Sequence, residues 1–507
     1  MKDGNKIKNN LLIGIGCQLL AMILGVLVPK LVLNNYGSEI NGLLSSVTNI
    51  YACIALVEAG VMAASCQALY KALAKNTRDD ANSVLSATNI YYRRTGLIYS
   101  ALIAVFSVVY PLFIKSEIPF WTVFLVILFN GLGNVVNFFF HGKYLFLLKA
   151  DGKNYVRSGV EMFSNAAKQI SKIVLISLGF NVVFVQFAAM LTSFAQMIYI
   201  TYYIKKHYSW IDLNAKPNFE SISQSKNVFV HEVNFLITTN VDTVLLTLFS
   251  TLKQVSVYSL YNLIYNMVFR VIHTIQESLE FKVAYAFHTD REAFLKIFKA
   301  YETYFITFSF VLYTIMTYFA LPFMALYTKG VDDVDYLLSN LPLAFAVMNL
   351  MTIGKYPSLS MVHIANHFKQ TQNSAIIEAV INILVSIVLI QFYGIYGALL
   401  GTMASSFYRT NYLVLYVNKK IINRSSFGTY KCLFLNFAVF GLIMYLNKYI
   451  VFEIASYGKL FLYCIPYSLC VLLVYFIVAA ISEPKTFAFV LQTVKRMLNS
   501  REVVNEN

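Results

Sequence analysis

About fourteen apolar runs of membrane-spanning length divide this chain of 507 residues. A helix needs about 20 mostly apolar residues to cross the hydrocarbon of a bilayer. Hydrophobic residues make up 58% of the chain and charged residues 13%, far below the rough quarter that is typical of a soluble domain. The sequence therefore predicts an all-α, multi-pass membrane protein. The predicted spans are residues 10–34, 42–70, 95–114, 119–142, 156–179, 182–204, 228–251, 255–284, 297–320, 336–363, 373–393, 395–418, 432–449 and 457–482.

The chain also repeats itself at an offset of about 213 residues. The matched positions are Gly142-Lys143-Tyr144 with Gly354-Lys355-Tyr356, Ser193 and Phe194 with Ser406 and Phe407, and Ser45, Ile50 and Tyr51 with Ser259, Ile264 and Tyr265. An even number of spans separates the copies, so both halves enter the membrane in the same orientation. In transporters such parallel repeats face each other across a substrate site. The repeat predicts a six-helix lobe at 1–205, a linker at 206–227, a second six-helix lobe at 228–420, and two further helices with a tail at 421–507.

Lysine and arginine gather in alternate loops, which sets the predicted topology. Both termini and the two longest loops, at 71–94 and 205–227, carry basic residues and are expected in the cytoplasm. The net charge of +15 is thus explained by orientation and predicts no nucleic-acid partner. No long loop is left on the outer face for a catalytic domain, and the six cysteines have no metal-binding spacing. We expect neither an enzyme nor a cofactor.

Two predicted spans carry a narrow polar stripe. Polar residues inside a span are costly and usually face a cavity or the bundle interior. Because a helix turns by about 100° per residue, the first stripe falls within an arc of roughly 80°. The fifth span carries Arg157, Glu161, Asn165, Lys168 and Lys172, and the eighth carries Asn262, Asn266, Arg270, His273, Glu277 and Glu280.

Snorkelling and ion pairing are alternative roles for these charges. Charges near a span end, such as Arg157, Lys282 and Arg409, are expected to reach the interface by snorkelling. Charges can also pair along or between helices. The candidate pairs are Glu161 with Lys168 or Lys172, and Arg270 with Glu277. Lys168 and Arg270 lie about eleven residues or more from either boundary, beyond snorkelling reach, and Lys172 lies one turn from Lys168, seven residues from the end of the span. We predict that all three line the transport path.

Isolated polar residues mark further spans. Asp242 shares one face of the seventh span with His231, Asn234 and Thr238, and Glu58 lies at a comparable depth in the second span. Both carboxylates are candidates either for coupling transport to an ion or for an ion pair, Asp242 with Arg270 or Lys355. Other isolated charges are Lys355, Glu378 and Arg409, and three tyrosines suited to packing or to stacking on sugar are Tyr258, Tyr261 and Tyr265.

Three short segments carry a resemblance to a known family. They are Asn34-Asn35-Tyr36-Gly37-Ser38-Glu39-Ile40-Asn41-Gly42-Leu43, Val255-Ser256-Val257-Tyr258-Ser259 and Tyr393-Gly394-Ile395-Tyr396-Gly397-Ala398. With the span pattern and the repeat, they resemble polysaccharide flippases of the Wzx type, from the superfamily that also contains multidrug exporters and lipid II flippases. The resemblance covers nearly the whole chain. It implies two six-helix bundles that face each other in a V, with two added C-terminal helices.

The resemblance also implies a substrate and a cell membrane. Such flippases move an undecaprenyl-diphosphate-linked oligosaccharide from the cytoplasmic to the outer leaflet of the bacterial inner membrane by alternating access, and a polysaccharide polymerase would be a partner. A diphosphate cannot cross hydrocarbon unpaired, and cations in a cavity offset that cost. The expected substrate-binding residues are Lys168, Lys172, Arg270, Lys355, Asn266 and His273, and the expected coupling or ion-pair residues are Asp242, Glu58, Glu161 and Glu277.

Three alternatives remain. A multidrug exporter of the same superfamily would favour acidic residues for cationic drugs, whereas the deep charges here are mostly cations. A lipid II flippase would carry arginines in its first helices, but the first span here has no central charge and the second has only Glu58. A membrane polysaccharide polymerase would need a large outer loop with catalytic residues. The acidic residues Asp332, Asp333 and Asp335 form the only outward acidic cluster and are expected to be a solvated turn.

Overall fold

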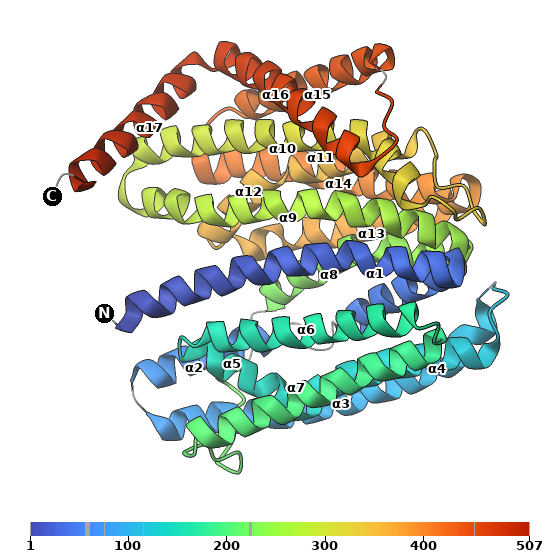
Figure 1. The fold of residues 1–507 in the computed structure, drawn as a ribbon. Coiled ribbons are helices and arrows are strands. Elements are labelled where there is room, and N and C mark those ends of the chain that lie inside the picture. Colours follow the sequence, from blue (N-terminus) through green and yellow to red (C-terminus); the bar gives the residue numbers. More distant parts are fainter. Residues whose placement is uncertain are drawn as a thin grey trace. The chain divides into compact units, whose positions relative to one another are not determined.

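The computed structural model describes residues 2–55, 61–75, 77–114, 116–222, 226–450 and 452–505. Every regular element among these residues is a helix, as Figure 1 shows, which confirms the predicted all-α class. Seven of the helices are long and apolar enough to cross a membrane by length and composition alone: they are Arg78–Phe113, Phe120–Phe140, Val182–His207, Arg291–Tyr327, Phe368–Tyr393, Phe427–Tyr449 and Tyr457–Ser482. The chain is a multi-pass membrane protein.

The helices follow the predicted order of spans. In chain order they are α1 (Lys2–Ile54), α2 (Val61–Ala74), α3 (Arg78–Phe113), α4 (Phe120–Val136), the π-helical η2 (Asn137–His141), α5 (Gly142–Ala150), α6 (Asn154–Ser177), α7 (Val182–His207), α8 (Lys226–Phe249), α9 (Leu252–Thr289), α10 (Arg291–Tyr327), α11 (Leu341–Ile353), α12 (Tyr356–Ile364), α13 (Phe368–Tyr393), α14 (Ile395–Val417), η3 (Asn418–Ile422), α15 (Phe427–Leu446), η4 (Asn447–Tyr449), α16 (Tyr457–Ser482) and α17 (Pro484–Asn505).

The chain forms two compact units. Unit 1 contains residues 1–259 and 330–334, and unit 2 contains residues 260–329 and 335–507. The division falls within α9, because α8 packs against α1 and therefore belongs to unit 1. The repeat instead places the boundary at the linker 206–227, and the two six-helix lobes that it defines stay a prediction.

Several helices are longer than the predicted spans. α3 has 36 residues and α10 has 37, so each is about 55 Å long at 1.5 Å per residue. Such a helix exceeds the roughly 30 Å of hydrocarbon. The predicted cytoplasmic loop 71–94 is therefore mostly helical, because α3 begins at Arg78. The predicted C-terminal tail also forms a helix, α17, which Figure 1 shows at the C-terminus. Hydropathy detects only the part of a helix that lies in hydrocarbon.

Polar caps fix the start of two long helices. The Asn181 side chain accepts a hydrogen bond from the Phe184 N–H at 2.9 Å and begins α7. The Asp290 carboxylate accepts from the N–H groups of Glu292 and Ala293 at 2.9 and 3.1 Å and begins α10. These acceptors satisfy backbone donors that have no partner in the first turn of a helix. Asn181 lies directly before the predicted span at 182–204, whereas Asp290 begins α10 seven residues before the predicted span at 297–320.

Regular helix is interrupted at three of the segments that the sequence singled out. Gly37 has φ 80° and ψ 178°, which divides α1 into two helical segments. The first contains the predicted span 10–34, and the second, which ends at Ile54, contains the first part of the predicted span 42–70. Gly142 follows the π-helical turn η2, and Gly354 with Lys355 separates α11 from α12. Both copies of the Gly-Lys-Tyr repeat thus lie where a span departs from regular α-helix. Such departures leave backbone groups and side chains free to take other partners.

Aromatic side chains pack among a larger number of aliphatic ones in the interior of each unit. In unit 1 Tyr99 packs on Phe138 with a centroid separation of 4.8 Å. In unit 2 Tyr265 packs on Phe345 at 5.4 Å, and its hydroxyl donates to the Pro342 carbonyl at 2.7 Å. Tyr261 likewise donates to the Tyr336 carbonyl at 2.8 Å. Both tyrosines are fully buried, which confirms the packing interpretation.

Candidate functional site

The polar stripe on α6 splits into a paired end and an unpaired middle. The Arg157 Nε lies 2.9 Å from the Glu161 carboxylate, so Glu161 pairs with Arg157 and not with Lys168 or Lys172. Neither of these lysine ammonium groups has a hydrogen bond or ion pair with any residue that the structure describes. They are four residues apart on one helix, where like charges repel by a few tenths of a kcal/mol. An anion beside them would relieve that repulsion.

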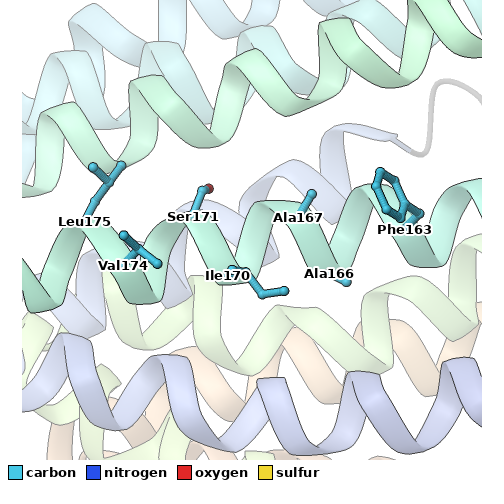
Figure 2. Close-up of a pocket in the computed structure, with 7 residues that line it drawn as sticks. All are labelled: Phe163, Ala166, Ala167, Ile170, Ser171, Val174 and Leu175. Carbon is cyan, nitrogen blue, oxygen red and sulfur yellow. The ribbon is translucent and has the colours of Figure 1, made fainter.

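The opposite side of α6 is apolar. A cavity of about 520 Å³ is lined there by Phe163, Ala166, Ala167, Ile170, Ser171, Val174 and Leu175. Figure 2 shows these side chains along the length of α6. Ser171 is the only polar residue among them. At 100° per residue, this face is roughly opposite the stripe of Lys168 and Lys172. α6 therefore presents cationic groups on one side and an apolar groove on the other.

The stripe on α9 also contains a cation without a partner. His273 Nδ1 lies 3.6 Å from Glu277, and the Asn266 amide donates to Asn262 at 3.0 Å. Arg270 is exposed, and its guanidinium makes no hydrogen bond or ion pair with the described part of the chain. The predicted alternative, an Arg270–Glu277 pair, is wrong because Glu277 turns to His273 one turn away.

Hydrogen bonds join the C-terminal part of α9 to α12. Ser360 on α12 donates to the Glu280 carboxylate at 3.2 Å and accepts from the Gln276 amide at 3.0 Å. Gln276 and Ser360 are buried. Glu280, the last member of the predicted stripe, therefore has a packing role, whereas Arg270, Asn266 and His273 remain on the accessible surface of the helix.

Asp242 is buried within unit 1. Its side chain is 4% exposed, and the Tyr258 hydroxyl donates to Asp242 Oδ2 at 3.1 Å. Tyr258 lies in one of the segments that resemble the flippase family, and this contact was not predicted. On the same face, Thr238 donates to the Asn234 carbonyl at 2.9 Å. The other proposed coupling residue, Glu58, lies outside the described residues.

The strongest charge cluster lies inside unit 2 and contains Lys355. The Lys355 Nζ donates to Glu378 on α13, and the Arg409 Nε on α14 lies 3.4 Å from the second carboxylate oxygen. Arg409 also donates to the Thr371 carbonyl at 3.0 Å. Glu378 and Arg409 are 1% and 2% exposed. The expectation that Arg409 snorkels is wrong, because its guanidinium turns inward to a buried carboxylate.

This cluster means that Lys355 is already engaged by a protein carboxylate. Two cations surround one anion, so the cluster keeps one net positive charge inside the bundle. In the other copy of the repeat, the Lys143 Nζ donates to the Asn89 side chain at 2.7 Å, and its partner is a neutral amide. At the repeat offset of 213, the positions that match Glu378 and Arg409 are Asn165 and Gln196, both uncharged amides.

A second buried acid in unit 2 was missed by the sequence reasoning. Glu302 on α10 accepts from the Arg424 guanidinium at 2.6 Å and from the Thr429 hydroxyl at 2.7 Å. A further acid, Glu483, lies 3.3 Å from the Lys299 Nζ and 3.6 Å from the Lys431 Nζ. These ties anchor α15 and α17 to α10. No signal in one sequence links residues so far apart in the chain.

A further polar cluster was also missed, at the predicted cytoplasmic ends of unit 1. The Tyr208 hydroxyl donates to Asp151 at 2.6 Å and accepts from the Lys153 Nζ at 3.0 Å. Burial, reinforced by the hydrogen bond to Asp151, raises the pKa of Tyr208, so the phenol stays a neutral donor. The cluster ties the turn between α5 and α6 to the end of α7, and it fixes one end of the α6 stripe.

Comparison with known proteins shows the fold. No protein-family model and no curated protein sequence matches the chain. Among solved structures, the lipid II flippase MurJ in an inward closed conformation has a TM-score of 0.68 at 16% identity, covering 94% of this chain and 100% of MurJ. The chain therefore has a fold similar to that of MurJ. A multidrug resistance MATE family transporter of the MOP superfamily is similar in its inward-facing and outward-facing conformations.

The two MATE comparisons cover most of both proteins. The inward-facing structure gives a TM-score of 0.59 at 13% identity, covering 80% of this chain and 98% of the transporter. The outward-facing structure gives 0.53 at 14% identity, with 81% and 93% covered. These likenesses support the predicted fold. Identities this low carry no information on substrate, which depends on the site residues.

Proposed function

We propose that this protein is a flippase that moves an undecaprenyl-diphosphate-linked oligosaccharide from the cytoplasmic to the outer leaflet of the bacterial cell membrane. The observation that carries the proposal is the set of deep cations without protein carboxylates. Lys168 and Arg270 lie in the central parts of α6 and α9, and Lys172 lies one turn beyond Lys168. None of the three has an ion-pair partner among the described residues. Lys355 and Arg409, in contrast, share Glu378. The first group is free to bind an anion.

The chemistry of the substrate suits this set. A diphosphate needs cations to enter a low-dielectric path, and Arg270 offers a planar fork that binds phosphate oxygens through two N–H groups. Asn266 and His273 lie one turn on either side of Arg270 and would contact the phosphates or the first sugar. The apolar groove on α6 is of a kind that suits hydrocarbon chains. No enzyme chemistry is required for this reaction, and alternating access would supply the transfer.

A reconstitution experiment tests the proposal. Purified protein in vesicles that contain the lipid-linked oligosaccharide should expose the glycan to an enzyme or lectin added outside, faster than protein-free vesicles. In cells, deletion of the gene should remove surface polysaccharide and leave its lipid-linked repeat unit in the inner leaflet. Normal surface polysaccharide after deletion, together with no transfer in vesicles, would refute the proposal.

Lipid II flippase activity is the second candidate, because MurJ matches over its whole length. Its substrate carries the same diphosphate on a polyprenyl chain, so the deep cations suit it as well. The absence of charge in the centre of the first predicted span argues against it. Rescue of growth in cells depleted of their lipid II flippase would favour this candidate, and rescue of surface polysaccharide in a mutant that lacks its polysaccharide flippase would favour ours.

The proposed orientation has its own test. Single cysteines introduced at 78–94 or 205–222 should be labelled by an impermeant reagent only from the cytoplasm, and a cysteine near Asp333 only from outside. A native-cysteine-free background is needed because the chain contains six cysteines. Outside labelling in 205–222 would leave an odd number of spans in the first half and break the repeat. If the labelling agrees with the predicted orientation, a partner polymerase would be sought at the outer face.

A further inference from the structure

A seam of buried small residues joins the two halves of the sequence inside unit 1. On one side lies the second segment of α1, which follows Gly37, and on the other lie α8 and the first turns of α9. The Asn41 amide donates to the Ser256 hydroxyl at 2.7 Å, and a 2.6 Å hydrogen bond joins the hydroxyls of Ser46 and Thr247. All four side chains are buried.

Gly42 lies between these hydrogen bonds and allows the closest approach. A Cβ added at Gly42 would lie 1.9 Å from the Leu252 carbonyl oxygen and 2.8 Å from its carbonyl carbon. No side chain fits in that space, so the backbones meet directly. Leu252 also belongs to the buried hydrophobic cluster that contains Leu43 and Val47, so the seam combines polar contacts and direct backbone contact with apolar packing. Separating it would break two buried hydrogen bonds and expose this apolar surface.

The loop between α10 and α11 closes the end of this seam. Asp333 accepts from the Ser38 backbone N–H at 2.9 Å and from the Ser38 hydroxyl at 2.5 Å. Ser38 begins the helical segment after Gly37, where backbone N–H groups lack helical partners and a carboxylate is favoured by the helix dipole. Residues 330–334 therefore belong to unit 1, although the chain on either side of them belongs to unit 2. Asp333 was predicted to lie in a solvated turn. Its side chain is exposed, as expected, but it also accepts two hydrogen bonds from the buried Ser38.

We propose that this seam is the outer gate of the transport path and that Asp333 is its latch. The inference rests on the proposed transport function and on the predicted topology, which places the turn at Gly37 and the loop at Lys329 outside. In this structure the gate is closed. Opening requires Asp333 to leave Ser38 and the two buried hydrogen bonds to break, so that α8 and α9 move away from α1.

A reversible cross-link tests the gate. The hydroxyl oxygens of Ser46 and Thr247 lie close enough for cysteines at both positions to form a disulfide. In a background without native cysteines, the Ser46→Cys/Thr247→Cys protein should lose transport by about tenfold or more when oxidised and regain it on reduction. The matched control is Ser65→Cys/Thr88→Cys, whose hydroxyls are 3.1 Å apart and buried but lie wholly in the first half. Its oxidation should leave transport unchanged.

The latch has a separate test that does not depend on the substrate. Asp333→Ala should raise the rate at which an impermeant maleimide labels a cysteine at Asn41 from outside, by about fivefold to tenfold, the effect of losing one helix cap. Asp332→Ala removes the same charge from a neighbour that makes no hydrogen bond or ion pair with a described residue and should change nothing. Gly42→Ala should act in the same direction as Asp333→Ala because its methyl group wedges the seam.

The outcomes separate failure of the gate from failure of the proposed function. Full disulfide formation at Ser46 and Thr247 with undiminished transport would overturn the gate. Equal labelling in Asp333→Ala and Asp332→Ala would overturn the latch. If no lipid-linked glycan is moved by any variant, including the unmodified protein, the proposed function fails, and the labelling result still decides whether the seam opens.

Discussion

The two copies of the Gly-Lys-Tyr repeat bury the same lysine in different electrostatic surroundings. Lys143 donates to the neutral amide of Asn89, while Lys355 shares the carboxylate of Glu378 with Arg409. The helix is interrupted at both places. The Lys355–Glu378–Arg409 cluster is compensated by an internal acid, whereas Lys168 and Lys172 in unit 1 and Arg270 in unit 2 have no such acid among the described residues. Buried charge in this cluster is thus neutralised inside the protein, whereas we propose that the cations of α6 and α9 bind the anionic group of the substrate.

The largest loss of stability is expected from Glu378→Gln. This change leaves Lys355 and Arg409 buried without their shared anion, and breaking a buried ion pair in this way costs about 3–5 kcal/mol. The thermal unfolding midpoint of the purified protein in detergent should fall sharply. The double variant Glu378→Gln/Arg409→Gln, which mimics the amides of the first half, should recover part of the loss. A midpoint equal to that of the unmodified protein would show that the cluster is not structural.

A smaller loss is expected at the matching lysine of the first half. Asn89→Ala removes the acceptor of the Lys143 ammonium, and an unsatisfied buried donor costs about 1–3 kcal/mol. The same unfolding measurement compares the two sites directly. If Asn89→Ala lowered the unfolding midpoint as much as Glu378→Gln, the difference between an amide partner and a carboxylate partner would have no effect on stability.

A still smaller change in stability is expected for Asp242→Asn, together with a loss of transport. Asparagine keeps an oxygen that can accept from Tyr258, so the stability cost should be about 1 kcal/mol. A coupling carrier loses its titratable group and should stop net transport while substrate binding survives. Tyr258→Phe is the control, because it removes the donor and keeps the carboxylate. Unchanged transport by Asp242→Asn from mildly acidic to mildly basic pH would make Asp242 a bystander.

The sequence predicted the helical class and the approximate spans because hydrocarbon demands long apolar helices, a constraint that acts locally on the chain. It could not predict the partner of Arg409, because helix position alone favoured the interface and the acid that holds it is 31 residues away on another helix. The sequence also predicted that Lys168, Lys172 and Arg270 lie deep in their spans, and this depth stays a prediction.

The contact between Asp333 and Ser38 could not be predicted from the sequence for a different reason. Asp333 is 295 residues from Ser38, and an acidic turn between two spans ordinarily indicates a solvated loop. The hydrogen-bonding needs of the helix that starts after Gly37 become visible only when the chain is folded. The Gly37–Leu43 part of the family-like segment, by contrast, was noticed as a pattern before its physical role in the seam was known. Its glycines and small polar residues are required where backbones meet.

The central claim, that unpaired cations in the middle of α6 and α9 bind the anionic group of the substrate, is tested most directly by transport in Lys168→Ala and Arg270→Ala. Both variants should keep the unfolding midpoint, since neither cation has an ion-pair partner among the described residues to leave behind, and removing Lys168 relieves repulsion of a few tenths of a kcal/mol. Transport of lipid-linked glycan should be abolished in both. Arg270→Lys should retain part of it because the charge survives without the fork. Arg157→Ala, in the paired part of the α6 stripe, is the matched control and should transport normally. Wild-type surface glycan from both alanine variants at normal expression would contradict the account.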